Sequence, residues 1–90
     1  MNSKEEKRLG LLERMRKSKS NWKKEDIERL YKEFGFVLRH GSNHDVVSHP
    51  EFPILRATLA RHKALPKGYV QFAVKLIDRL LELQKEGNNE

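Results

Sequence analysis

Two short β-type segments joined by a tight turn, residues 36–39 and 44–49, limit most strongly what this chain can fold into. The turn at residues 41–43 consists of glycine, serine and asparagine, which tolerate or stabilise the unusual backbone angles that a tight connection needs. These segments therefore predict a β-hairpin. Because the second segment has a valine at each parity, alternation leaves open which face of the hairpin carries His44.

A third strand and two helices are expected around this hairpin. Pro50 and Pro53, which cannot donate to a strand ladder, bracket a second turn before a strand over residues 54–59. Apolar residues at helical spacing predict one helix before the hairpin and another after the third strand. The order α-β-β-β-α indicates an α+β fold in which both helices cover one face of a three-stranded antiparallel sheet.

The expected bounds of the two helices come from capping residues and from apolar periodicity. The first helix is expected to begin with Ser20 or Asn21 as its cap and to end at Gly35. The second is expected to begin near Lys67 and to fray around Lys85. We expect one main domain over residues 21–86, followed by a disordered tail over residues 87–90.

Residues 1–20 are expected to form a basic N-terminal arm. The first 18 residues contain six basic and three acidic side chains. Three apolar residues share one helical face, which allows a short extra helix, but Gly10 weakens it by about 1 kcal/mol relative to alanine. We expect a solvated, partly mobile arm, and an arm that contacts RNA or a partner is the alternative.

Charge and composition narrow the classes of partner and of chemistry. The chain has 19 basic and 13 acidic residues, a net charge of +6, which makes a polyanion the first partner to test. It has no cysteine, which excludes disulfides and thiol chemistry. No apolar run approaches the ~20 residues that span a bilayer, and the N-terminus lacks the apolar core of a secretory signal. A cytoplasmic location is therefore expected.

Several short motifs occur together with this order of elements over roughly residues 22–80: Gly35-Phe36, Gly41-Ser42-Asn43-His44-Asp45, His49-Pro50, Arg61-His62-Lys63 and Lys67-Gly68. In this combination the chain resembles the HicA family of toxin mRNA interferases. The resemblance implies a fold like that of a double-stranded RNA-binding domain. It also implies a small ribonuclease that cleaves mRNA, is neutralised by a HicB-type antitoxin protein, and uses one histidine after the Gly-Ser turn. The matching residue in this chain is His44.

The candidate site follows from the chemistry of RNA cleavage. The ribose 2′-hydroxyl is the nucleophile, so the protein must move protons and stabilise charge on phosphorus. Imidazole suits the proton steps because its ordinary pKa is about 6.5. The resemblance makes His44 the catalytic candidate, acting as acid or base, whereas the residues taken alone favour an ordinary surface histidine at this position. The candidate RNA-binding residues are Arg39, Ser42, Arg61, His62, Lys63 and Lys67.

Each candidate has a less specialised interpretation. For the basic residues the alternative is an ordinary solvated surface, and for Ser42 it is a role in stabilising the turn. His62 is either a second site residue or a surface residue. The chain has four histidines, but without cysteine, clustered carboxylates or ligand spacing they predict no metal site, and no cofactor is expected.

Three functions stay open from the residues and the resemblance together. The first is a metal-independent endoribonuclease toxin. The second is a non-catalytic RNA-binding module with the same fold, since fold does not imply function. The third is a protein that binds only other proteins, and it would show no salt-sensitive affinity for RNA.

Overall fold

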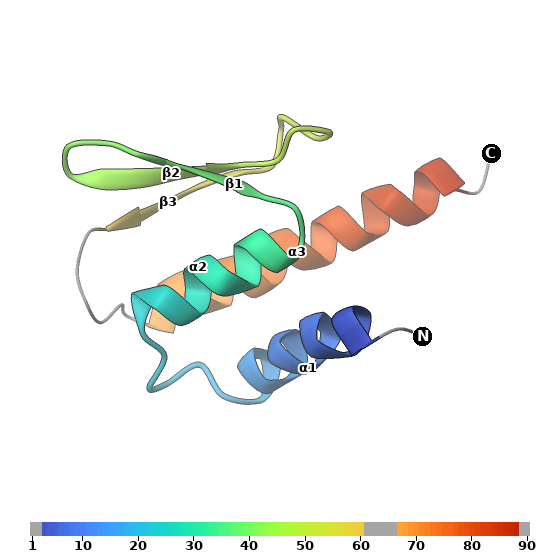
Figure 1. Ribbon diagram of the computed structural model, residues 1–90, viewed down its shortest axis with the longest axis horizontal. Coiled ribbons are helices and arrows are strands. Elements are labelled where there is room, and N and C mark those ends of the chain that lie inside the picture. The colour runs from blue at the N-terminus through green and yellow to red at the C-terminus, as the bar shows by residue number, and fades with distance from the viewer. Residues whose placement is uncertain (1–2, 61–66, 89–90) are drawn as a thin grey trace.

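The computed structural model describes residues 3–60 and 67–88 of the 90-residue chain. These residues form three helices and three strands, in the order α1 (Ser3–Lys17), α2 (Lys24–Glu33), β1 (Val37–His40), β2 (His44–Ser48), β3 (Arg56–Ala60) and α3 (Lys67–Asn88). The strands make an antiparallel sheet in the order β1-β2-β3. Figure 1 shows α2 and α3 beneath this sheet, and α1 on the far side of those two helices. The predicted α+β class and antiparallel meander are confirmed, and a third helical layer is added to them.

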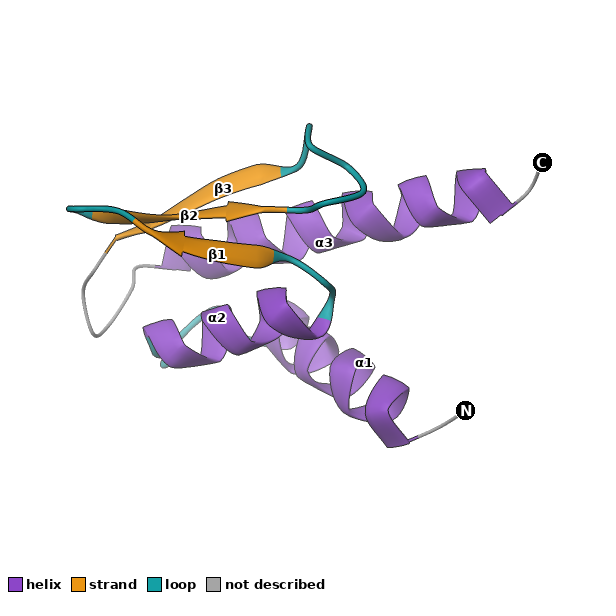
Figure 2. Cartoon of the chain, turned by 45° about the horizontal axis from the view of Figure 1, so that its top comes forward, coloured by secondary structure: helices purple, strands orange, loops and turns teal. Residues whose placement is uncertain are grey.

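The register of the sheet settles which side chains face the helices. His40 lies opposite Asp45, and His44 lies opposite Ala60. In β2, Asp45 and Val47 are buried while His44 and Val46 are exposed. We use the name outer face for the side of the sheet away from the helices (Figure 2), which carries Val37, Arg39, His44, Val46, Ser48, Arg56 and Thr58. His44 therefore belongs to the outer face, a point that the sequence left open.

The first turn of α2 differs from the predicted one. The residue that caps the helix is Lys23, whose backbone N–H donates to Asp26 Oδ2 at 2.9 Å. The expected caps, Ser20 and Asn21, are wrong. Asn21 instead has a φ of 66°, a left-handed conformation that asparagine accepts more readily than most residues. The helix consequently begins at Lys24.

The end of α2 at Gly35 is confirmed, and its geometry explains why a glycine stands there. Gly35 has a φ of 88°, and its N–H donates to the carbonyl of Lys32 at 3.1 Å. The N–H of Phe36 donates to the carbonyl of Tyr31 at 3.0 Å, and the two rings meet edge to face. This pair of bonds is a Schellman motif. A Cβ on Gly35 would also lie 3.2 Å from Nε2 of His49, so both the backbone angle and the tight contact disfavour a side chain at this position.

The hairpin turn needs a glycine because the two strands lie close together there, and not because of unusual backbone angles. None of residues 41–43 has a positive φ, which corrects the expectation that they supply such angles. The N–H of Gly41 donates to the carbonyl oxygen of His44 at 2.9 Å. A Cβ on Gly41 would lie 2.6 Å from that same oxygen. Gly41 is therefore required because the two strands approach closely where His44 begins β2.

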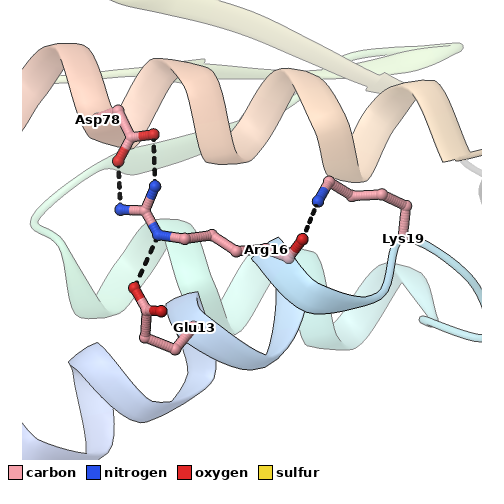
Figure 3. A network of polar contacts seen from close by, with 4 residues as sticks. All are labelled: Glu13, Arg16, Lys19 and Asp78. Carbon is pink, nitrogen blue, oxygen red and sulfur yellow. Dashed lines mark hydrogen bonds and ion pairs between the residues drawn. The ribbon is translucent and has the colours of Figure 1, made fainter.

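The N-terminal segment packs against the domain over the part whose side chains are described. Leu11, Leu12 and Met15 of α1 are buried in the same core as residues of α2 and α3. Arg16 binds Asp78 of α3 through both guanidinium Nη atoms, with Nη1 to Oδ2 at 2.7 Å, as Figure 3 shows. The expectation of a solvated, mobile arm is wrong for this part of α1. The proposed contact of the arm with RNA or a partner stays untested.

The last helix and the third strand are shifted from their predicted bounds. The helix α3 continues to Asn88, so Gly87 and Asn88 are helical and not part of a disordered tail. The strand β3 begins at Arg56, two residues later than predicted, and Ile54 before it is 84% exposed. None of the helices in the described residues is long and apolar enough to cross a membrane.

Candidate active site

The outer face of the sheet carries positive charge without acidic side chains. Among the described strand residues the only carboxylate is Asp45, which points to the helix side. Arg39 lies opposite Val46 in the register, two positions along β2 from His44. On an antiparallel pair such diagonal neighbours lie within reach of a long side chain, at about 7–8 Å. Arg56 adds a second guanidinium on β3, opposite Ser48. A phosphate on this face would meet only cationic and neutral side chains.

His44 is the first residue of β2 and is exposed to solvent. Its backbone is fixed by the bond from Gly41 described above. Its imidazole makes no hydrogen bond or ion pair with another described residue. Both ring nitrogens are therefore open to a ligand, on a backbone that the hairpin holds in place.

The other predicted site residues are distributed unevenly. Ser42 is exposed in the turn and makes no side-chain hydrogen bond with a described residue. Lys67 is exposed at the start of α3, which lies at the same end of the molecule as the hairpin turn (Figure 1). Arg61, His62 and Lys63 lie outside the described residues. Of the predicted set, only Arg39 and His44 are brought onto one face by the described strands.

A polar cluster that sequence reasoning missed lies on the helix side of the same hairpin. Asp45 is fully buried, and Nδ1 of His40 lies 2.9 Å from Asp45 Oδ1. The other carboxylate oxygen accepts a hydrogen bond from Lys24 Nζ, at the start of α2. Nζ of Lys24 also lies 3.4 Å from Oε1 of Glu28. We call Lys24, Asp45 and His40 the buried-aspartate cluster.

The pKa shifts in this cluster keep both partners charged. The hydrogen bond from Lys24 is the largest cause that lowers the pKa of Asp45, and that from His40 is the second, against the opposing effect of burial. The hydrogen bond to Asp45 is likewise the main cause that raises the pKa of Lys24. Because an ionised carboxylate can only accept, Nδ1 of His40 carries the proton of this bond. The unprotonated ring nitrogen of the neutral form is then Nε2, on a side chain that is 70% exposed.

Part of this cluster could be read from the hairpin. Once Gly41 and His44 flank a two-residue turn, the next pair outward is His40 with Asp45, so the register alone predicts that they are neighbours. The contribution of Lys24 could not be read in this way, because it depends on how α2 lies across the sheet. Its position 21 residues before Asp45 gives no signal in the sequence.

His49 has a structural role. It is buried, and its Nδ1 accepts a hydrogen bond from the backbone N–H of Glu51 at 3.1 Å. Its ring packs edge to face on Phe36 with centroids 5.0 Å apart, and at a tilt on Phe52. An imidazole enclosed in this way holds the end of β2 and is not available to a substrate.

A hollow of about 520 Å³ lies apart from these histidines, along the β3 edge of the sheet beside α3, so residues of both faces of β3 line it. Its lining includes Tyr31, Arg56, Thr58, Tyr69 and Phe72. The hydroxyl of Tyr31 is buried without a hydrogen-bond partner among the described residues, and burial raises its pKa. The described residues of its lining include no histidine and no carboxylate.

The histidines, aspartates and glutamates of the described residues form no group of three that could hold a metal ion. The chain matches no family model, no curated protein and no solved structure.

Proposed function

We propose that this protein is an endoribonuclease toxin of the HicA kind, which binds and cleaves mRNA on a fold like that of a double-stranded RNA-binding domain. The observation that carries the proposal is the outer face, where the open imidazole of His44 shares a carboxylate-free surface with Arg39 and Arg56. The resemblance of the sequence motifs to that family supports the same assignment. Such a toxin acts in the cytoplasm, where mRNA is translated.

The roles of the side chains follow from their chemistry. A phosphodiester laid along the outer face would be held by Arg39, whose guanidinium can bond two phosphate oxygens at once. His44 would exchange a proton with the reacting 2′-oxygen or with the leaving 5′-oxygen. One such group contributes about 10²- to 10⁴-fold in rate, which suits a slow enzyme that acts on abundant mRNA.

The antitoxin of such a system would act by covering this surface. A HicB-type partner with acidic side chains would meet complementary charge at Arg39 and Arg56. Two exposed apolar residues of the same face, Val37 at 55% and Val46 at 39%, would be buried in the complex. Reversing charge on the outer face should therefore weaken neutralisation more than reversing charge on the exposed side of α3, for example at Lys75 or Lys85.

The test is incubation of purified protein with mixed-sequence mRNA in EDTA, with wild type beside His44→Ala and Thr58→Ala. Thr58 is exposed on the same face and carries no acid–base group, so it is the matched control. We expect wild type and Thr58→Ala to cleave equally, and His44→Ala to bind RNA but cleave at least about 10²-fold more slowly. A strict requirement for Mg²⁺ would contradict the proposal. Salt-sensitive binding without cleavage by any variant would identify a non-catalytic RNA-binding module instead.

A further inference from the structure

We infer that His40 is a second catalytic residue of the proposed cleavage, the general base that takes the proton of the 2′-hydroxyl, and that buried Asp45 is its positioning residue. The inference rests on the proposed function and adds a residue that the sequence did not single out. It starts from the buried-aspartate cluster, which places a fully buried carboxylate 2.9 Å behind an exposed imidazole.

The arrangement has the properties that a histidine base needs. Asp45 accepts from Nδ1 of His40, which leaves Nε2 as the nitrogen that can receive a proton at the surface. The same carboxylate stabilises the imidazolium that forms when the proton arrives. Lys24 holds the carboxylate in place from the other side, so the direction of the imidazole is determined by two elements, α2 and β2.

The charged side chains considered around His40 belong to β2, to α2 and to β1 itself. Asp45 of β2 contacts the ring directly. Lys24 and Glu28 of α2 stand behind Asp45 and partly compensate one another at 3.4 Å. Arg39, the neighbour of His40 in β1, points to the outer face. Among the described residues, the carboxylate of Asp45 is therefore the only charged group that forms a hydrogen bond or ion pair with this imidazole.

His40 and His44 flank the same turn but lie on opposite faces of the hairpin. Cleavage by the 2′-oxygen requires this oxygen and the leaving 5′-oxygen to lie in line, on opposite sides of phosphorus. A base and an acid for this reaction must consequently approach from opposite sides. A phosphate at the tip of the hairpin, beside Ser42 and Asn43, would meet His40 from one side and His44 from the other.

The proposed step conserves protons and electrons. Nε2 of His40 takes the proton of the 2′-hydroxyl while the 2′-oxygen forms a bond to phosphorus. The bond from phosphorus to the 5′-oxygen breaks, and the imidazolium of His44 gives its proton to that oxygen. The products are a 2′,3′-cyclic phosphate and a 5′-hydroxyl, and exchange of one proton each with water restores both histidines.

A leaving-group substitution separates the two roles. A short RNA is prepared with sulfur in place of the bridging 5′-oxygen at one position, because a thiolate is a much weaker base than an alkoxide and departs without an acid. We expect His44→Gln to be slowed about 10²-fold or more on the oxygen substrate and to recover most of this loss on the sulfur substrate. We expect His40→Gln to be slowed on both. Folding of each variant is checked by thermal melts.

Asp45→Asn tests the positioning role separately from folding. We expect kcat to fall about tenfold or more with KM unchanged. In ¹⁵N spectra of imidazole, neutral His40 should carry its proton on Nδ1 in wild type and should lose that preference in Asp45→Asn, with His44 as the internal control.

The outcomes distinguish this inference from the proposed function. If wild type cleaves and His40→Gln cleaves the oxygen substrate within threefold of it, the inference is wrong and the proposed function stands. If sulfur rescues His40→Gln and not His44→Gln, His40 is the acid and its assignment as base is overturned. If wild type cleaves neither substrate, the proposed function fails and the inference fails with it.

Discussion

The buried carboxylate of Asp45 gives a stability prediction whose dependence on pH can be worked out from its contacts. Asp45→Asn keeps the shape of the side chain but removes its charge, and its NH₂ group would face a donor, either Lys24 Nζ or His40 Nδ1. A hydrogen bond to a charged group contributes about 1.5–3 kcal/mol to stability. Both partners of Asp45 lie near the surface, because the Lys24 side chain is 17% exposed and the His40 side chain 70% exposed. Because solvent screens both partners, we expect a total loss of about 1–3 kcal/mol at pH 7.

The sign of the pH dependence follows from the lowered pKa of Asp45. Its folded-state pKa lies below the unfolded value of 3.8, so the ionised form stabilises the native state above about pH 4. As the pH falls through the folded-state pKa, the carboxylate becomes protonated and this contribution disappears. The difference in unfolding free energy between wild type and Asp45→Asn should therefore shrink below pH 4.

The assay is urea denaturation followed by circular dichroism at pH 7, 5 and 3. The matched control is Glu51→Gln, which removes the same charge from an exposed side chain that makes no ion pair with a described residue. We expect the control to change stability by less than about 0.5 kcal/mol at every pH. A difference for Asp45→Asn that is as large at pH 3 as at pH 7 would show that the cluster is not held by an ionised carboxylate.

Three further predictions follow from single contacts. Leu12→Ala should lower the free energy of unfolding, measured by urea denaturation, by about 2–4 kcal/mol because Leu12 is only 1% exposed. Leu9→Ala should lower it by less than about 1 kcal/mol because Leu9, in the same helix, is 39% exposed. Equal losses would show that α1 does not belong to the core. Gly35→Ala should lower the melting temperature, since alanine is strained at a φ of 88° and its Cβ would press on His49, and an unchanged melting temperature would refute the Schellman end of α2. Arg39→Ala should weaken RNA binding uniformly across sequences and should reduce the slope of the logarithm of the binding constant against the logarithm of salt concentration by about 1. An unaltered slope would show that RNA does not contact the outer face at Arg39.

The sheet could be predicted from the sequence because its signals are local. A tight turn between two β-type segments gives a hairpin, and closely spaced strands then give an antiparallel meander. The face of His44 could not be predicted in the same way, because Val46 and Val47 offer an apolar side chain to each face. Asp45 faces the helices, where Lys24 of α2 binds its carboxylate, and its neighbour His44 consequently faces outward.

The docking of α1 shows a different limit of prediction. Its apolar group is small, and Gly10 argues against a helix, so the segment taken alone favours a solvated arm. The helix is stabilised by contacts that are distant along the chain: Leu12 and Met15 are buried in the shared core, and Arg16 binds Asp78, 62 residues away. Tertiary packing supplies most of the stability of short helices, and a pattern within the helix cannot reveal it.

The candidate site divides in the same way. Arg39 and His44 could be placed near each other because both belong to the predicted hairpin, but only the observed register shows that they share a face. The buried-aspartate cluster needed the position of α2 as well. The resemblance therefore singled out His44, while the exposure of its side chain and the contact of His40 with Asp45 became visible only in the folded chain.

The chemistry of the RNA ends that the wild-type protein leaves in EDTA decides whether this protein is a metal-independent ribonuclease. Purified protein is incubated with a 5′-labelled mRNA, and the fragments are treated with a phosphatase that removes 2′,3′-cyclic phosphate. The account predicts fragments that carry this cyclic end and a 5′-hydroxyl, formed without a divalent cation. Intact RNA bound to the protein, or fragments that form only when Mg²⁺ is added, would contradict it.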